Sequence, residues 1–233
     1  MNFLTHYYLH RKKDDNHFTV GLTLPDLFSF ISRKIRISHV LLEKIYNFNE
    51  DQNQKSLICG MSLHLQLDKW FHKSTFFYEN VIILNDECIK NSINDFPSFL
   101  YHVLLEIFID RYLLKLYPSL ADEFYESYKK FNFPETANLF TVVNEFNKDE
   151  FVDFAIRISN SNFLREYVDC GLIISILNRI GTRIVKKELF PENDISLINS
   201  FNNIYDKIEV NIKNFFDKEE WNDHINLNPN LFN

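Results

Sequence analysis

Apolar residues recur every three or four positions along most of this chain, which is the period of helices that pack one face against a core. Residues 99–117 are apolar on almost every side, as is typical of a buried helix. We find no stretch with the period of two that marks a half-buried strand. The pattern therefore predicts an all-α fold: a single-domain bundle of about seven to ten helices with short connections.

Capping residues and prolines set the expected helix boundaries. Pro25 suits a first helical turn, Ser38 and Asp194 suit N-caps, and Pro118 and Pro191 follow helix ends. The predicted helices cover residues 24–32, 38–47, 54–73, 75–90, 97–117, 120–131, 135–147, 149–158, 164–189 and 194–216. Residues 223–233 are polar and contain Pro229, so we predict a helical domain over residues 1–222 followed by a loose tail.

Composition supports this picture and excludes some functions. The 233 residues include only 4 glycines, fewer than turn-rich β or α/β proteins use. The net charge of -7 argues against general nucleic-acid binding, which needs a basic surface. The 3 cysteines are an odd number without a close pair, which is typical of reduced thiols, and neither a signal peptide nor a membrane span is expected. We therefore expect a cytoplasmic protein of unknown oligomeric state.

Two predicted helices carry ionisable side chains at four-residue spacing among apolar residues. His64, Asp68 and His72 form one row, and Glu106 and Asp110 form another. Residues four apart lie on the same face of a helix, and imidazole and carboxylate groups bind divalent metals. If the two rows face each other, they form a metal site.

A plainer interpretation stays open for these rows. Charged stripes on helices are usually solvated faces, and Asp68 could pair with Lys69 or Arg111. However, Glu106 and Asp110 lie among apolar neighbours. Burying a carboxylate without a partner costs free energy, on the order of several kcal/mol. Spacing alone does not decide between the two interpretations.

Several motifs follow one another in a fixed order along nearly the whole chain. They are MNFLTH at residues 1–6, Gly21 with Asp26-Leu27, Leu63-His64 with Asp68 and Phe71, Glu106 with Asp110-Arg111, residues 167–183, and Phe215-Phe216. Their order and spacing resemble the acyl carrier protein phosphodiesterases, all-helical enzymes related to HD-domain phosphohydrolases. The family motifs are MNFLAH, GNxxxDF, LHRxIDxFTDxHP and DxxxDH. The resemblance implies an HD-domain-like fold.

The resemblance also implies an activity. Members cleave the phosphodiester between 4′-phosphopantetheine and a serine of holo-acyl carrier protein, using a Mn²⁺-type ion. The metal and phosphate site that it implies here consists of His6, Asp26, His64, Asp68, Glu106 and Asp110, with His72 as a further ligand. Asp26 or Asp110 would take a proton from water. Arg111 and Arg183 would bind phosphate, and Arg33, Lys34 and Arg36 would dock the acidic carrier protein.

The chain departs from the family pattern at several of these positions. Leu22 replaces an asparagine, His72 an aspartate, Ser74 a histidine and Glu106 an aspartate. Arg111 replaces a histidine, and arginine neither coordinates metal nor acts as a base near neutral pH. Three functions therefore stay open: the phosphodiesterase, a non-catalytic protein that binds a carrier protein or a phosphate ester, and a phosphohydrolase with another substrate.

Overall fold

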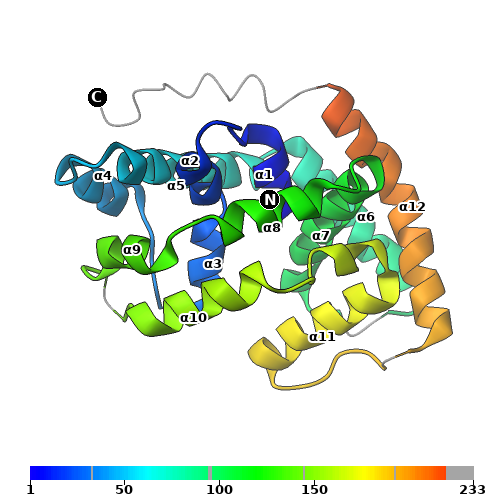
Figure 1. Cartoon of the computed structure of the whole chain (residues 1–233). Coiled ribbons are helices and arrows are strands. Elements are labelled where there is room, and N and C mark those ends of the chain that lie inside the picture. The colour runs from blue at the N-terminus through cyan, green and yellow to red at the C-terminus, as the bar shows by residue number, and fades with distance from the viewer. Residues whose placement is uncertain (33, 94–95, 144, 192, 219–233) are drawn as a thin grey trace.

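The computed structural model describes residues 1–32, 34–93, 96–143, 145–191 and 193–218 (Figure 1). These residues form twelve α-helices and two 3₁₀ helices and contain no strand, so the all-α prediction is confirmed. The first helices are α1 Phe3–His10, α2 Asn16–Gly21, α3 Leu24–Ile31, α4 His39–Asn47, α5 Gln52–Phe71, α6 Thr75–Lys90 and α7 Ser98–Leu116. The others are α8 Leu120–Lys129, α9 Phe133–Ala137, η1 Asn138–Phe140, α10 Lys148–Ser159, η2 Arg165–Val168, α11 Cys170–Val185 and α12 Ile195–Asp217.

The helix count exceeds the predicted seven to ten because some elements are short. Neither α1 nor α2 was predicted, and they have only 8 and 6 residues. The predicted helix over residues 164–189 is instead η2 and α11, because the Asp169 carboxylate accepts hydrogen bonds from the backbone N–H groups of Gly171 and Leu172 and begins a new helix there. The helix predicted over 135–147 is mostly wrong, since α9 ends at Ala137. The predicted tail, 223–233, lies outside the described residues.

Helix α7 forms the centre of the bundle. It packs against α1, α6, α11 and α12, and side chains all round it are buried, including Leu104, Phe108 and Asp110. Figure 1 shows α4 and α5 at one end of the molecule and α12 along the other. A helix without a solvent face cannot be amphipathic, which explains why the sequence of α7 lacks an apolar stripe. Between Phe99 and Leu114, its polar residues therefore face other protein groups or a cavity.

Two glycines allow α2 and α5 to lie unusually close. A Cβ atom on Gly21 would lie 2.2 Å from the Leu57 carbonyl oxygen, and one on Gly60 would lie 2.2 Å from the Phe18 carbonyl oxygen. No side chain fits at such a distance from backbone, so both positions require glycine. The close crossing brings the loop after α2 onto α5, beside His64.

Helices α6 and α12 are joined by polar contacts as well as by apolar packing. Glu87 of α6 pairs with Lys207 of α12 and, at 2.8 Å, with Lys90. The Asn211 side-chain amide donates to the Asn80 side-chain oxygen at 2.8 Å. None of the helices in the described part of the chain has the length and apolar character needed to cross a membrane.

Candidate metal centre

Two groups of histidine and carboxylate side chains come from α1, α3, α5 and α7, with His72 at the C-cap of α5. The first consists of His6, Asp26 and His64, from α1, α3 and α5, and the ligand atoms of these side chains lie within 4.8 Å of one another. The second consists of Asp68, His72 and Glu106, with the same maximum separation. The structure thus brings together six of the seven residues that were predicted as metal ligands.

His64 is held in a single orientation within the first group. Its Nδ1 lies 2.7 Å from the Leu22 carbonyl oxygen, which can only accept, so Nδ1 carries the proton. The other nitrogen, Nε2, then has a free lone pair and lies 3.5 Å from Asp26 Oδ1. Burial lowers the pKa of His64 to about 4, so the ring is neutral near pH 7. An imidazole fixed through its second nitrogen is the usual form of a metal ligand.

His6 is fully buried, yet neither of its ring nitrogens has a hydrogen-bond partner among the described residues. Its ring lies 4.0 Å from that of His64, measured between centroids. Burial and the neighbouring His64 keep the pKa of His6 well below 6.5, so it too is neutral. Buried polar atoms are almost always paired, so an orphaned imidazole in the core calls for a functional explanation.

Asp26 completes the first group and also has a buried atom without a hydrogen-bond partner. Its Oδ2 is buried without a hydrogen-bond partner among the described residues, although the side chain as a whole is 27% exposed. Burial and the negative charge of Asp68 raise the pKa of Asp26 well above 3.8. Two neutral imidazoles and a carboxylate, each with an unused donor atom, fit the nitrogen and oxygen preferences of a divalent transition metal.

The second group is neutralised by cationic groups of the protein. The Met1 ammonium donates to Asp68 Oδ1 at 2.7 Å and to Glu106 Oε1 at 3.3 Å. His72 Nε2 lies 3.2 Å from Glu106 Oε1, and His72 Nδ1 lies 3.3 Å from Asp68 Oδ2. Burial opposes the charge on His72, but its hydrogen bonds to the two carboxylates raise its pKa to about 10. Unlike the first group, this one already has its charges paired.

Asp110 lies outside both groups and holds α1 in place. Its oxygens accept from the backbone N–H groups of Leu4 and Thr5, at 3.2 and 2.9 Å, and from Thr5 Oγ1 at 2.7 Å. The side chain of Asn2, at the N-cap of α1, makes no capping bond, so Asp110 satisfies the free N–H groups of the first turn instead. Burial raises the pKa of Asp110 to about 7 despite these bonds. Asp110 therefore positions the helix that carries His6.

A cavity of about 800 Å³ opens beside the two groups, within the range of about 300–1,000 Å³ that is usual for small-molecule sites. Asp26 of the first group and Glu106 of the second both line it, together with His102 and Tyr167. Most of the remaining lining residues are apolar, and α7 and α11 together supply half of them; the others come from the start of the chain, α3, α10 and the loop after α10. The cavity therefore gives a small molecule access to one carboxylate of each group.

The predicted arginine and lysine sites are dispersed. Arg183 lines the cavity, but Arg111 points toward α11 and α12, where it contacts the Cys170 thiol, the Asn202 side-chain oxygen at 3.0 Å and the Tyr205 ring. We therefore leave Arg111 out of the site.

Of the three residues predicted to dock a carrier protein, Lys34 and Arg36 are exposed and do not line the cavity. Lys34 Nζ lies 3.6 Å from Glu145 Oε1. Arg33 lies outside the described residues.

Sequence reasoning missed the cavity itself and two of its cations, Arg157 and Arg179. The available signal was the row of isoleucines at positions 176, 180 and 184 of α11, which places three apolar side chains on one helical face. Sequence alone does not show that an apolar helical face borders empty space rather than a neighbouring helix.

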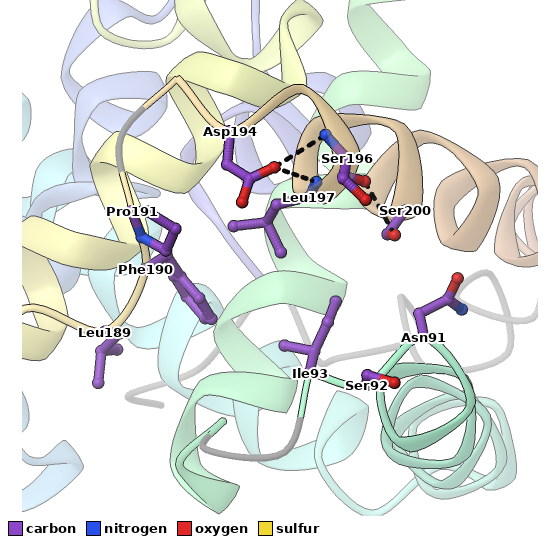
Figure 2. Close-up of a pocket in the computed structure, with 10 residues that line it drawn as sticks. All are labelled: Asn91, Ser92, Ile93, Leu189, Phe190, Pro191, Asp194, Ser196, Leu197 and Ser200. Atoms are coloured by element: carbon purple, nitrogen blue, oxygen red, sulfur yellow. Dashed lines mark hydrogen bonds between the residues drawn. The ribbon is translucent and has the colours of Figure 1, made fainter.

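A second, open pocket of about 370 Å³ lies between the end of α6 and the start of α12 (Figure 2). Its carboxylate, Asp194, accepts hydrogen bonds from the backbone N–H groups of Ser196 and Leu197 and so caps α12. Ser196 and Ser200 add hydroxyl groups, and none of the described residues that line the pocket is a histidine or a cysteine. The described lining therefore offers a metal fewer ligands than the two groups at α5 do.

The chain matches no family model, and neither a curated protein nor a solved structure matches it. The resemblance to acyl carrier protein phosphodiesterases and the HD-domain-like description therefore stay predictions based on the motifs.

Proposed function

We propose that this protein is a metal-dependent phosphoester hydrolase. The observation that carries the proposal is the set of unpaired, buried donor atoms on His6 and Asp26, next to a cavity large enough for a substrate. A structural histidine would have its nitrogens bonded, whereas a ligand needs a free lone pair.

His6, Asp26 and His64 would hold the ion. A divalent ion bound there would polarise a phosphoryl oxygen and lower the pKa of a water molecule toward neutrality. The protein's own residues prepare the site: the Leu22 carbonyl fixes the tautomer of His64, and Asp110 anchors the helix of His6. Of the two aspartates predicted as proton acceptors, only Asp26 lines the cavity.

Holo-acyl carrier protein is the candidate substrate that the motif resemblance implies. Arginines on the cavity wall supply positive charge for a phosphodiester or for an acidic carrier protein, and Arg183 is the one that was predicted. The motif resemblance implies an ion of the Mn²⁺ type, and nitrogen and oxygen ligands are compatible with such an ion.

The test is to incubate the purified protein with Mn²⁺ and holo-acyl carrier protein and to follow the carrier by mass spectrometry. We expect loss of the phosphopantetheine mass, abolished in Asp26→Asn and retained in Asp86→Asn, a matched change at an exposed carboxylate of α6. Bis(p-nitrophenyl) phosphate serves as a second, generic substrate. If the protein hydrolyses only this ester, it is a metal-dependent phosphoester hydrolase, but acyl carrier protein is not its substrate. Hydrolysis of neither substrate by the metal-loaded protein would contradict the proposal.

One observation favours a non-catalytic binding protein as the second candidate. The Met1 ammonium and His72 already neutralise Asp68 and Glu106, so this half of the centre needs no metal for charge balance. A binding protein of this kind would contain no stoichiometric transition metal, and Asp26→Ala would alter its stability but not its ligand affinity.

A further inference from the structure

The cavity of about 800 Å³ that Asp26 and Glu106 line is also lined by residues of α7 and α11 that lie away from the candidate metal centre. These two helices run antiparallel: the Phe96 ring, just before α7, lies 5.6 Å from the ring of Phe190, just after α11, measured between centroids. At the other end, Arg111 of α7 contacts Cys170, the first residue of α11. The early part of α7 therefore faces the late part of α11.

Each helix lines the cavity with an apolar residue at every fourth position. These residues are Phe99, Val103 and Ile107 of α7 and Ile176, Ile180 and Ile184 of α11. Each run spans eight residues, which at a rise of about 1.5 Å per residue gives an apolar channel about 12 Å long. The antiparallel arrangement places Glu106 near the Ile176 end and Arg183 near the Phe99 end.

The two ends of this channel differ in charge and exposure. Asp26 and Glu106, carboxylates of the candidate metal centre, line one end. Arg183 is exposed and lines the other end, and it has no hydrogen bond or ion pair among the described residues. Arg179 is also exposed, but it pairs at 3.4 Å with Glu166 of η2, just before α11, and so lies toward the Ile176 end. An apolar channel with a free cation at one end is complementary to a molecule that has an anionic group and an apolar chain.

We infer that the channel between α7 and α11 binds a long-chain anionic ligand, with its carboxylate or phosphate at Arg183 and its chain extending inward toward Asp26. This binding needs no metal and does not depend on the proposed hydrolysis. The chemistry is shared by fatty acids and alkyl phosphates, and the binding experiment separates the two.

The test is calorimetric titration of the full chain in EDTA, below the concentrations at which the ligands form micelles. The probes are decyl phosphate and decanoate, with butyl phosphate as the short-chain control and decyltrimethylammonium as the control of opposite charge. Each buried methylene strengthens binding about fourfold, the equivalent of about 0.8 kcal/mol, so decyl phosphate is expected to bind at least roughly a hundredfold more tightly than butyl phosphate. The tighter of decyl phosphate and decanoate identifies the head group.

Two variants locate the site. Arg183→Gln should weaken binding of decyl phosphate about tenfold, whereas Lys187→Gln, an exposed cation outside the cavity, should not. Ile180→Gln should weaken binding by interrupting the apolar wall, whereas Leu172→Gln, at an exposed residue in the first turn of the same helix that does not line the cavity, should not. Circular dichroism checks that each variant is folded.

Equal affinity for the decyl and butyl esters, equal affinity for decyltrimethylammonium, or no effect of Arg183→Gln in the folded protein would overturn the inference. Because every titration contains EDTA, loss of hydrolytic activity cannot imitate any of these outcomes. Conversely, a protein that binds decyl phosphate but never hydrolyses an ester would refute the proposed function and leave this inference standing.

Discussion

His6 provides a direct way to separate function from stability. The change His6→Leu removes the orphaned ring nitrogens and keeps a buried side chain of similar size. The neutral ring buries one donor and one acceptor without partners, and each unsatisfied group costs about 1–3 kcal/mol. The altered shape in the core costs up to about 1.5 kcal/mol. We therefore expect the free energy of unfolding of the metal-free variant to rise by about 1 kcal/mol.

The assay is urea unfolding followed by circular dichroism in EDTA. Thr5→Val is the matched control: it lies next to His6 and is equally buried, but its hydroxyl is bonded to Asp110 at 2.7 Å. Removing this satisfied group, and leaving its partner short of a donor, should lower the free energy of unfolding by about 1 kcal/mol or more. The two variants should thus differ in sign.

Added Mn²⁺ should raise the melting temperature of the wild type and leave that of His6→Leu unchanged. If the free energy of unfolding of His6→Leu in EDTA instead falls by more than about 1 kcal/mol, the imidazole stabilises the fold and its nitrogens are not free. That result would contradict the interpretation that the ring nitrogens of His6 are unpaired because they bind a ligand.

Further predictions concern the framework around the centre. Gly60→Ala should lower the free energy of unfolding by about 3 kcal/mol in urea denaturation, because its Cβ would lie 2.2 Å from a backbone oxygen. In Gly171→Ala, the control, the new Cβ meets side-chain atoms, and the free energy of unfolding should fall by under about 1 kcal/mol. Equal effects would contradict the close crossing of α2 and α5. Asp110→Asn should lower the free energy of unfolding by about 1–3 kcal/mol, because both carboxylate oxygens accept hydrogen bonds and an amide has only one accepting atom. An unchanged urea midpoint would show that Asp110 does not hold α1 in place. The Glu87 pKa is lowered from 4.5 by its hydrogen bonds to Lys207 and Lys90, so its contribution to stability is present above about pH 4.5 and is lost as pH falls through the lower folded-state value. The stability difference between wild type and Glu87→Gln should therefore shrink from pH 6 toward pH 3, and a difference that grows in acid would show that the ion pairs do not act in this way.

The sequence predicted those parts of the fold that local signals determine. Helix α6 has the predicted bounds, and Asp194 caps α12 as expected, because capping depends on residues close in sequence. No helix was predicted before residue 24, because short helices such as α1 and α2 depend on tertiary partners. The break at Asp169 was missed although its signal, an N-cap aspartate, is local. Asp110, for example, satisfies the first turn of α1 from more than a hundred residues away.

The structure brings six of the seven predicted ligands close together, but it divides them into two groups and leaves Asp110 outside both. The row of His64, Asp68 and His72 lies on one helix as expected, yet His64 belongs to one group and the other two to another. Spacing gives the helical face, whereas the grouping depends on how α1, α3 and α7 approach that face. The direction of the Arg111 side chain, toward α12, likewise depends on packing that spacing does not contain.

The central claim is that His6, Asp26 and His64 bind a divalent ion, and a metal count tests it most directly. Protein purified without chelators is analysed by inductively coupled plasma mass spectrometry, before and after Mn²⁺ loading and desalting. We expect about one ion per chain in the wild type and none in His6→Leu or Asp26→Asn. A wild-type chain that holds no ion after loading, or variants that hold as much as the wild type, would contradict the account.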